Sequence, residues 1–203
     1  MPATLSATES DLLTALRTFL LAYLMGSTEV IKGQVNRVAE PSNVNYVVMT
    51  PILRERLETN VSTYFDTAPF NIVSAGAGFF LATSSGAPIA VTPQPPGTRA
   101  ALLATRVTIQ LDIHGPLSAD NAQIVATLLR DTACCDALDA IGIDAQPLYA
   151  SDPRQIVFIN GEAQSEYRWT IDAAFQLNAF VTIPQEFTNT VRLGLVVADD
   201  LPF

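Results

Sequence analysis

Two long segments of this sequence alternate apolar and polar residues, and they restrict the possible folds more than any other feature of the chain. Residues 106–114 and 168–179 both place an apolar side chain at every second position. Successive side chains of a β-strand point to opposite faces of a sheet, so each segment predicts a strand with one buried face. The inward positions are Val107, Ile109, Leu111 and Ile113 in the first segment and Trp169, Ile171, Ala173, Phe175, Leu177 and Ala179 in the second.

Further strands are expected on both sides of these two. The run Tyr46–Glu58 has the composition of a strand, and Pro51 within it marks a bulge or an edge because proline cannot donate to a sheet ladder. Residues 155–159 form another candidate strand, followed by an Asn-Gly turn at residues 160–161. A last apolar strand is expected over residues 191–197.

Helices are predicted near the start and in the middle of the chain. Thr8 is placed to cap the first helix, apolar residues then recur at helical spacing, and Gly26 is expected to end it. A second helix is predicted from its cap, Ser118, to about Arg130, with a short third helix over residues 134–141. This order of elements predicts an α+β fold in which a mostly antiparallel sheet is flanked by helices.

Glycine and proline are concentrated between residues 68 and 98. They bracket two short runs of strand-forming residues, 79–83 and 89–92, and we interpret this segment as an inserted β-hairpin lobe. A length of 203 residues fits one domain with an appendage. We therefore expect residues 1–203 to form a single domain with an insertion at 68–98.

The composition of the chain excludes several classes of function. With 49% apolar and 15% charged residues, it is expected to fold. A net charge of -9 argues against a surface that binds nucleic acid, because replacing counterions on phosphates needs basic residues. The sequence predicts neither a membrane span nor a secretory signal, so we expect a cytoplasmic origin. So few charges also favour an oligomer, which would cover neutral surface.

Groups suited to catalysis or metal binding are sparse. His114 is the single histidine of the chain, and with Asp112 it is the one candidate for general-base chemistry. The adjacent Cys134 and Cys135 fit neither a disulfide nor a zinc site, and are interpreted as reduced packing residues. Phosphate-binding glycine motifs are incomplete. We expect no catalytic residues, no cofactor, no metal and no enzymatic activity.

Polar and aromatic residues on extended segments are better suited to contacts between protein chains. Charges of both signs alternate along residues 54–58, and charged and aromatic side chains meet at residues 166–169. An ordinary solvated face with surface ion pairs would have the same pattern. The candidates for subunit contacts are Arg54, Arg56, Glu58, Arg130, Arg168 and Trp169, of which Trp169 is equally compatible with a place in the core.

Several ordered blocks of the sequence resemble the phage neck terminator (tail terminator) proteins of tailed bacteriophages. They extend from the first helix to the last strand, and none carries a catalytic signature. The blocks are Glu29–Pro41, Tyr46–Pro51, Arg54–Asn60, Asp112–Pro116, Asp120–Gln123, Leu129–Asp131, Pro147–Gln155, Ile159–Gln164 and Tyr167–Thr170.

The resemblance implies a non-enzymatic virion protein with a tail-terminator-like fold. Proteins of this family form a ring, commonly of six subunits, that caps the tail tube and joins the tail to the head. The implied partners are further copies of the chain, the tail tube protein, a head-completion or connector protein and, where present, a tail sheath. DNA would only pass through the ring, and assembly would take place in the host cytoplasm.

Two other functions remain open from the sequence. A different head-tail connector or a tail-tube subunit would bind a portal complex or polymerise into tubes. A small-ligand-binding module would place a pocket under the segment 68–98, and loss of a measurable activity on His114→Ala would favour it.

Overall fold

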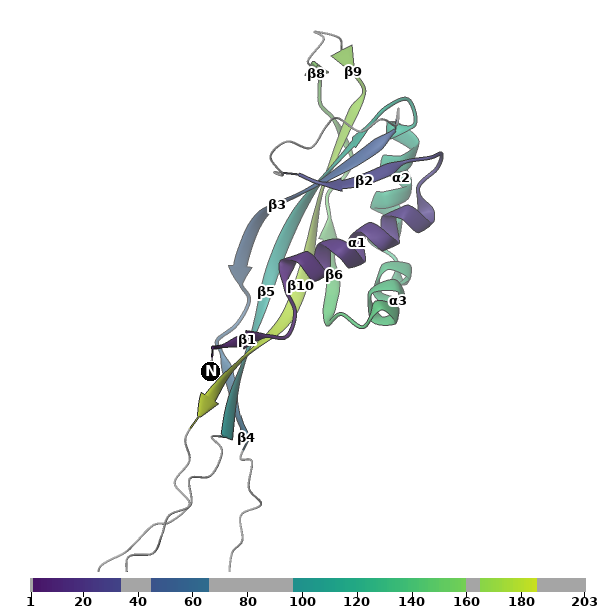
Figure 1. Ribbon diagram of the computed structural model, residues 1–203. Coiled ribbons are helices and arrows are strands. Elements are labelled where there is room, and N and C mark those ends of the chain that lie inside the picture. Colours follow the sequence, from purple (N-terminus) through teal and green to yellow (C-terminus); the bar gives the residue numbers. More distant parts are fainter. Residues whose placement is uncertain (1, 34–44, 66–96, 160–164, 186–203) are drawn as a thin grey trace, which may run out of the picture.

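The computed structural model describes residues 2–33, 45–65, 97–159 and 165–185. The larger of two sheets has the strand order β1-β10-β5-β3-β2, with β4 also on β5 and both β6 and β7 on β10 (Figure 1). Strands β8 and β9 pair separately. The strands are β1 Thr4–Leu5, β2 Glu29–Lys32, β3 Tyr46–Arg56, β4 Val61–Phe65, β5 Gly97–His114, β6 Ala145–Ala150, β7 Arg154–Gln155, β8 Phe158–Ile159, β9 Ser165–Glu166 and β10 Arg168–Gln185.

Strands β5 and β10 form the axis of the molecule. They pair antiparallel without a break from Arg168 opposite His114 to Gln185 opposite Gly97. Pairing in the large sheet is antiparallel throughout its described strands except between β2 and β3. The structure thus confirms an α+β fold with a mostly antiparallel sheet.

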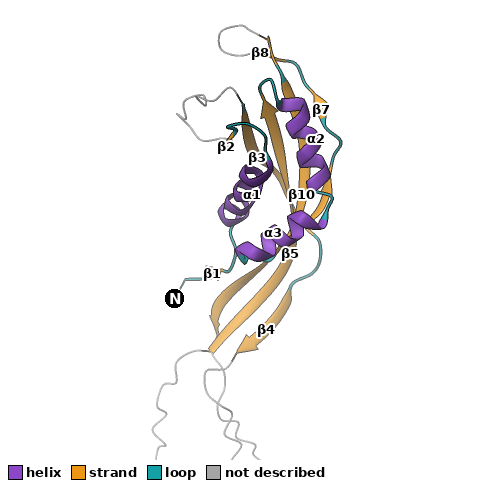
Figure 2. Cartoon of the chain, turned by 90° about the vertical axis from the view of Figure 1, so that its right-hand side faces the viewer, coloured by secondary structure: helices purple, strands orange, loops and turns teal. Residues whose placement is uncertain are grey.

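Three helices lie on one face of this sheet (Figure 2). They are α1 (Glu9–Tyr23), α2 (Ser118–Leu128) and α3 (Thr132–Ile141). Helix α1 begins at the predicted cap, where the Thr8 hydroxyl accepts from the Asp11 backbone amide and the Asp11 carboxylate accepts from the Thr8 amide. Such reciprocal bonds satisfy amides that the helix leaves unpaired, so the first turn is fixed locally.

The core lies between the helices and the odd-numbered side chains of β5 and β10. Val107, Ile109, Leu111 and Ile113 are almost completely buried, as alternation predicted. Their neighbours on β10 and the apolar stripe of α1 complete the same cluster. Burying apolar area at about 25 cal/mol per Å² makes this layer the main source of stability.

Strand β3 contains a bulge, as the proline in its middle indicated. Pro51 pairs with Ile109 and Leu53 pairs with Thr108, so Ile52 is an extra residue on β3. A single extra residue shifts the alternation of side chains between faces. After the bulge, Arg54 pairs with Val107 and shares the helix-covered face.

Several sequence-based boundaries are wrong. Helix α1 ends at Tyr23 and not at Gly26, because Leu24 is already extended and the next amide, that of Met25, bonds to Asn121. Ser118 is not a cap but the buried first residue of α2, which has no side-chain cap. The expected strand over 155–159 is divided between β7, which pairs with β10, and β8.

Some predicted elements fall outside the described residues. These are the strand over 191–197, the turn at 160–161 and nearly all of the inserted lobe, since residues 66–96 are not described. Residues 97 and 98, assigned to the lobe, belong to β5 instead. The strands on either side of 66–96 are paired with each other, with Phe65 opposite Thr98.

Candidate assembly interface

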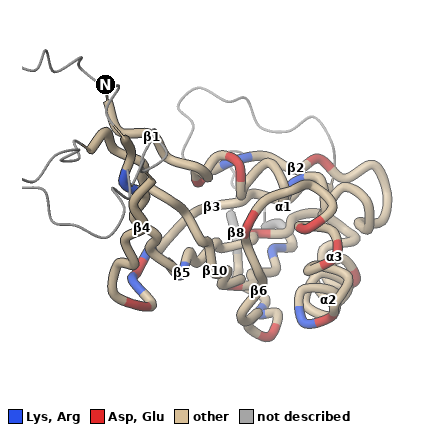
Figure 3. Tube along the Cα trace, turned by 90° about the horizontal axis from the view of Figure 1, so that it is seen from below, with Lys and Arg blue, Asp and Glu red and all other residues tan. Residues whose placement is uncertain are grey.

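One end of the sheet projects beyond the helices and forms an arm (Figures 1 and 2). We define the arm as β1, β4, residues 97–105 of β5 and residues 178–185 of β10. Arg99 is its one charged residue, and the traces of β1 and β4 are largely free of charge in Figure 3. The many acidic residues that give the chain its net charge of -9 are therefore located outside the arm.

The arm also exposes large apolar side chains. They are 37% to 56% exposed, and they come from β1, β4 and β10. The register places three of these side chains on each face of the arm. Exposed apolar surface with little charge is typical of the central part of a protein–protein interface. The residues are Leu5, Val61, Tyr64, Phe65, Phe180 and Val181.

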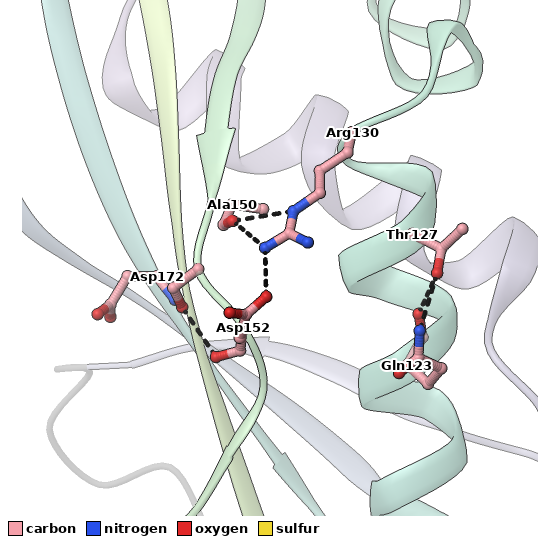
Figure 4. A network of polar contacts seen from close by, with 7 residues as sticks. Gln123, Thr127, Arg130, Ala150, Asp152 and Asp172 are labelled. Atoms are coloured by element: carbon pink, nitrogen blue, oxygen red, sulfur yellow. Dashed lines mark hydrogen bonds and ion pairs between the residues drawn. The ribbon is translucent and has the colours of Figure 1, made fainter.

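Two edges of the sheet in the helix-covered body are closed by arginines. Arg17 of α1 donates from Nε to the Val30 carbonyl of β2 at 3.0 Å. Arg130, after α2, donates from Nε and Nη2 to the Ala150 carbonyl of β6 at 3.1 and 2.7 Å, and its Nη2 contacts Asp152 at 2.8 Å (Figure 4). Each arginine occupies one edge carbonyl and covers part of its edge, which is one way in which exposed edges are blunted.

Strand β4 has no comparable protection. Its sequence, Val-Ser-Thr-Tyr-Phe, contains no charge, all five residues are exposed, and among the described strands it pairs with β5 alone. Exposed edges in monomeric proteins are commonly blunted by lysine, proline or a covering element. An uncharged, strand-forming edge is therefore a site at which another chain can pair.

Arg168, predicted as a contact residue, is engaged within the chain. Its Nε lies 3.1 Å from Asp112 Oδ1 and its Nη2 2.8 Å from Oδ2, while the Thr170 hydroxyl donates to Oδ1 at 2.6 Å. The Asp112 side chain is 10% exposed and that of Arg168 is 23% exposed. Beside this group, Tyr46 stacks on His114 with ring centroids 4.4 Å apart. The cluster ties β3, β5 and β10 together on the face without helices.

The other predicted contact residues divide into two groups. Arg54, Arg56 and Glu58 lie at the root of the arm and are exposed, and Arg54 approaches Glu9 of α1 at 3.7 Å. Arg130 serves the edge of β6, and Trp169 packs against the hydrophobic core. The structure thus brings the first three together and holds the other two, like Arg168, in separate internal contacts. Sequence analysis missed the arm, whose signal is an absence of charge.

Two grooves hollow the described surface. A groove of about 520 Å³ lies at the base of the arm, between the start of α1, the turn after α3 and β10. A second of about 330 Å³ lies beside Arg130 and Cys135. His114 and Asp112 line neither groove. The expected ligand pocket under the segment 68–98 falls outside the described residues.

The described residues contain neither a metal-binding cluster nor a membrane-spanning helix. Within the described ranges, no three His, Cys, Asp or Glu side chains are grouped so as to hold a metal ion. Burial, with the neighbouring Cys135, raises the pKa of the Cys134 thiol to about 12. None of the three described helices has the length and apolar character needed to cross a membrane.

Among the described residues, a helix-backed sheet continues into an arm that has no helix layer and one charged residue, which defines a small α+β protein with a surface suited to other protein chains. Comparison with protein families identifies the family to which this protein belongs. The model of the phage neck terminator protein matches residues 10–196, so the chain belongs to the phage neck terminator family. Comparison with curated proteins finds no match. The family assigns the chain a structural role at the neck and tail of the phage particle.

Proposed function

We propose that this protein is a structural, non-catalytic subunit of a ring, of six copies, that caps the tail tube and joins the tail to the head connector. Membership of the phage neck terminator family supports a role at this position. The charge-depleted arm is the single structural observation that carries the proposal. Apolar surface of this kind is stable in water when another chain covers it.

The partners in this proposal are other copies of the chain, the tube protein on one side and a head-completion or connector protein on the other, with a sheath in contractile tails. Assembly takes place in the host cytoplasm before incorporation into the virion. DNA passes through the lumen without being bound. A net charge of -9 supports this, because carboxylates repel phosphates. A lumen dominated by Arg54, Arg56, Arg106 or Arg168 would contradict it.

The experiment is to measure the mass of the purified protein by light scattering over a range of concentrations, and to image it by negative stain with and without tail tubes. We expect rings that seat on tube ends, in equilibrium with monomers. A protein that stays monomeric and ignores tube ends would refute the proposal. Self-polymerisation into tubes would identify a tail-tube subunit instead, and binding to a portal complex alone would identify another connector.

A further inference from the structure

The two lateral edges of the arm lie at the same height along it. Thr63 of β4 pairs with Ala100 of β5, which pairs with Thr182 of β10, which pairs with Thr4 of β1. The order across the arm is therefore β4-β5-β10-β1. Both outer strands are uncharged, and every residue of both is exposed.

We infer that β4 of one copy pairs antiparallel with β1 of the next copy, so that the arms join head to tail into one continuous sheet around the ring. This inference rests on the proposed ring. It assigns to the ring a main-chain contact, in which Thr63 of one subunit lies level with Thr4 of its neighbour.

Strand direction supports a second copy as the occupant of the β4 edge. Each neighbouring pair in the order β4-β5-β10-β1 is antiparallel, so β1 runs opposite to β4. Placing β4 of a second copy beside β1 therefore continues the antiparallel alternation without a parallel joint. The contact uses two different surfaces of the chain, which is what a closed ring requires.

Charge and edge protection point to the same arrangement. Neither β1 nor β4 carries a charge, so pairing them leaves no buried ion without a partner. The edges at β2 and β6 are partly covered by Arg17 and Arg130, and the described residues place no such arginine on β1 or β4. Among the described strands, the arm is thus where a sheet can grow from copy to copy.

Disulfide cross-linking between Thr4→Cys and Thr63→Cys tests this pairing. In one copy the two residues are three strand spacings apart, roughly 14 Å at about 4.8 Å each. A disulfide needs Cα atoms within about 7 Å, so the bond can form only between copies. The background carries Cys135→Ser, because Cys135 is partly exposed. Mild oxidation of the double variant is expected to give a ladder of covalent multimers on a non-reducing gel.

Three controls make the outcome decisive. Either cysteine alone should give no ladder, and covalent dimers from Thr63→Cys alone would overturn head-to-tail pairing in favour of a two-fold β4 contact. Gln123→Cys, exposed on α2, replaces Thr4→Cys as the matched distant control and should give none with Thr63→Cys. Finally, Thr63→Lys should lower the mass measured by light scattering from that of a ring to that of a monomer, with an unchanged circular dichroism spectrum. Thr132→Lys, at an exposed position of α3, should leave the mass of the ring unchanged.

The results separate this inference from the proposed function. Rings that form without a ladder and persist in Thr63→Lys would overturn the strand pairing and leave the ring intact. A wild-type protein that never forms rings would overturn both. A ladder from the double variant alone, together with monomeric Thr63→Lys, would support the pairing.

Discussion

Replacing Arg168 by alanine should destabilise the fold far more than a surface substitution. The change leaves the Asp112 carboxylate, 10% exposed, without its two-point contact to the guanidinium. Breaking a buried ion pair by removing one partner costs about 3–5 kcal/mol. Here Arg168 is itself 23% exposed, and the Thr170 hydroxyl still donates to Asp112, so water and this bond offset part of the loss. We expect a decrease of about 2–3 kcal/mol in the free energy of unfolding.

Urea denaturation followed by circular dichroism measures this value, and the chain supplies a matched control. Arg154 contacts Asp172 at 2.7 Å, but its side chain is 59% exposed, so Arg154→Ala should cost at most about 1 kcal/mol. A double-mutant cycle of Arg168→Ala with Asp112→Asn should give a coupling energy of about 1–2 kcal/mol. Equal losses in Arg168→Ala and Arg154→Ala, with no coupling, would refute the reasoning and return Arg168 to the candidate contacts between subunits.

Three further outcomes are expected. Leu16→Ala, at a position that is 0% exposed, should lower the free energy of unfolding by about 2–5 kcal/mol in the same urea assay, and a loss near zero would contradict the assigned core. Hydrogen bonds from Thr8 hold the pKa of Asp11 below its ordinary value of 3.8. Their contribution should be complete above that pH and lost as pH falls through the lowered pKa, so the difference in Tm between the wild type and Thr8→Ala should shrink in acid. Iodoacetamide should label Cys135 before Cys134, whose thiol stays neutral at pH 8, and mass spectrometry of the native protein should show one adduct, against two in denaturant.

Sequence analysis predicted the parts of the fold that local patterns specify. The alternation at residues 106–114 and 168–179 identified β5 and β10, because one face of each strand packs against a helix layer. The capping residue Thr8 was correct for a similar reason, since its bonds to Asp11 span only three residues. The break at Pro51 was also placed correctly.

The errors occur where contacts distant in sequence decide the outcome. Asn121 accepts from the Met25 amide at 2.8 Å, and this bond between residues 96 apart fixes the chain just after α1. The amide of Leu117, at the start of α2, likewise donates to Asn45, which no local pattern reveals. Arg168 was predicted as a subunit contact because charged and aromatic side chains meet at residues 166–169, whereas its partner Asp112 lies 56 residues away.

The candidate interface was difficult to predict for a different reason. Periodicity reports which face of a strand is buried within one copy, but the arm has no helix layer and residues 97–105 show no clean alternation. The informative signal was the lack of charge over several separate segments. Only their pairing showed that these segments form one end of the sheet.

The extra residue in β3 divides one side of the strand into an apolar part and a charged part. Val47 and Met49 face the core before Ile52, and Arg54 and Arg56 continue on that same side after it. If Ile52 took an ordinary place opposite Thr108, Leu53 would lie opposite Val107 and Glu55 opposite Thr105, and Arg54 would turn away from Glu9. The bulge thus sets where hydrophobic packing stops and a cationic rim begins, because a regular register would put a leucine and a glutamate where the two arginines lie.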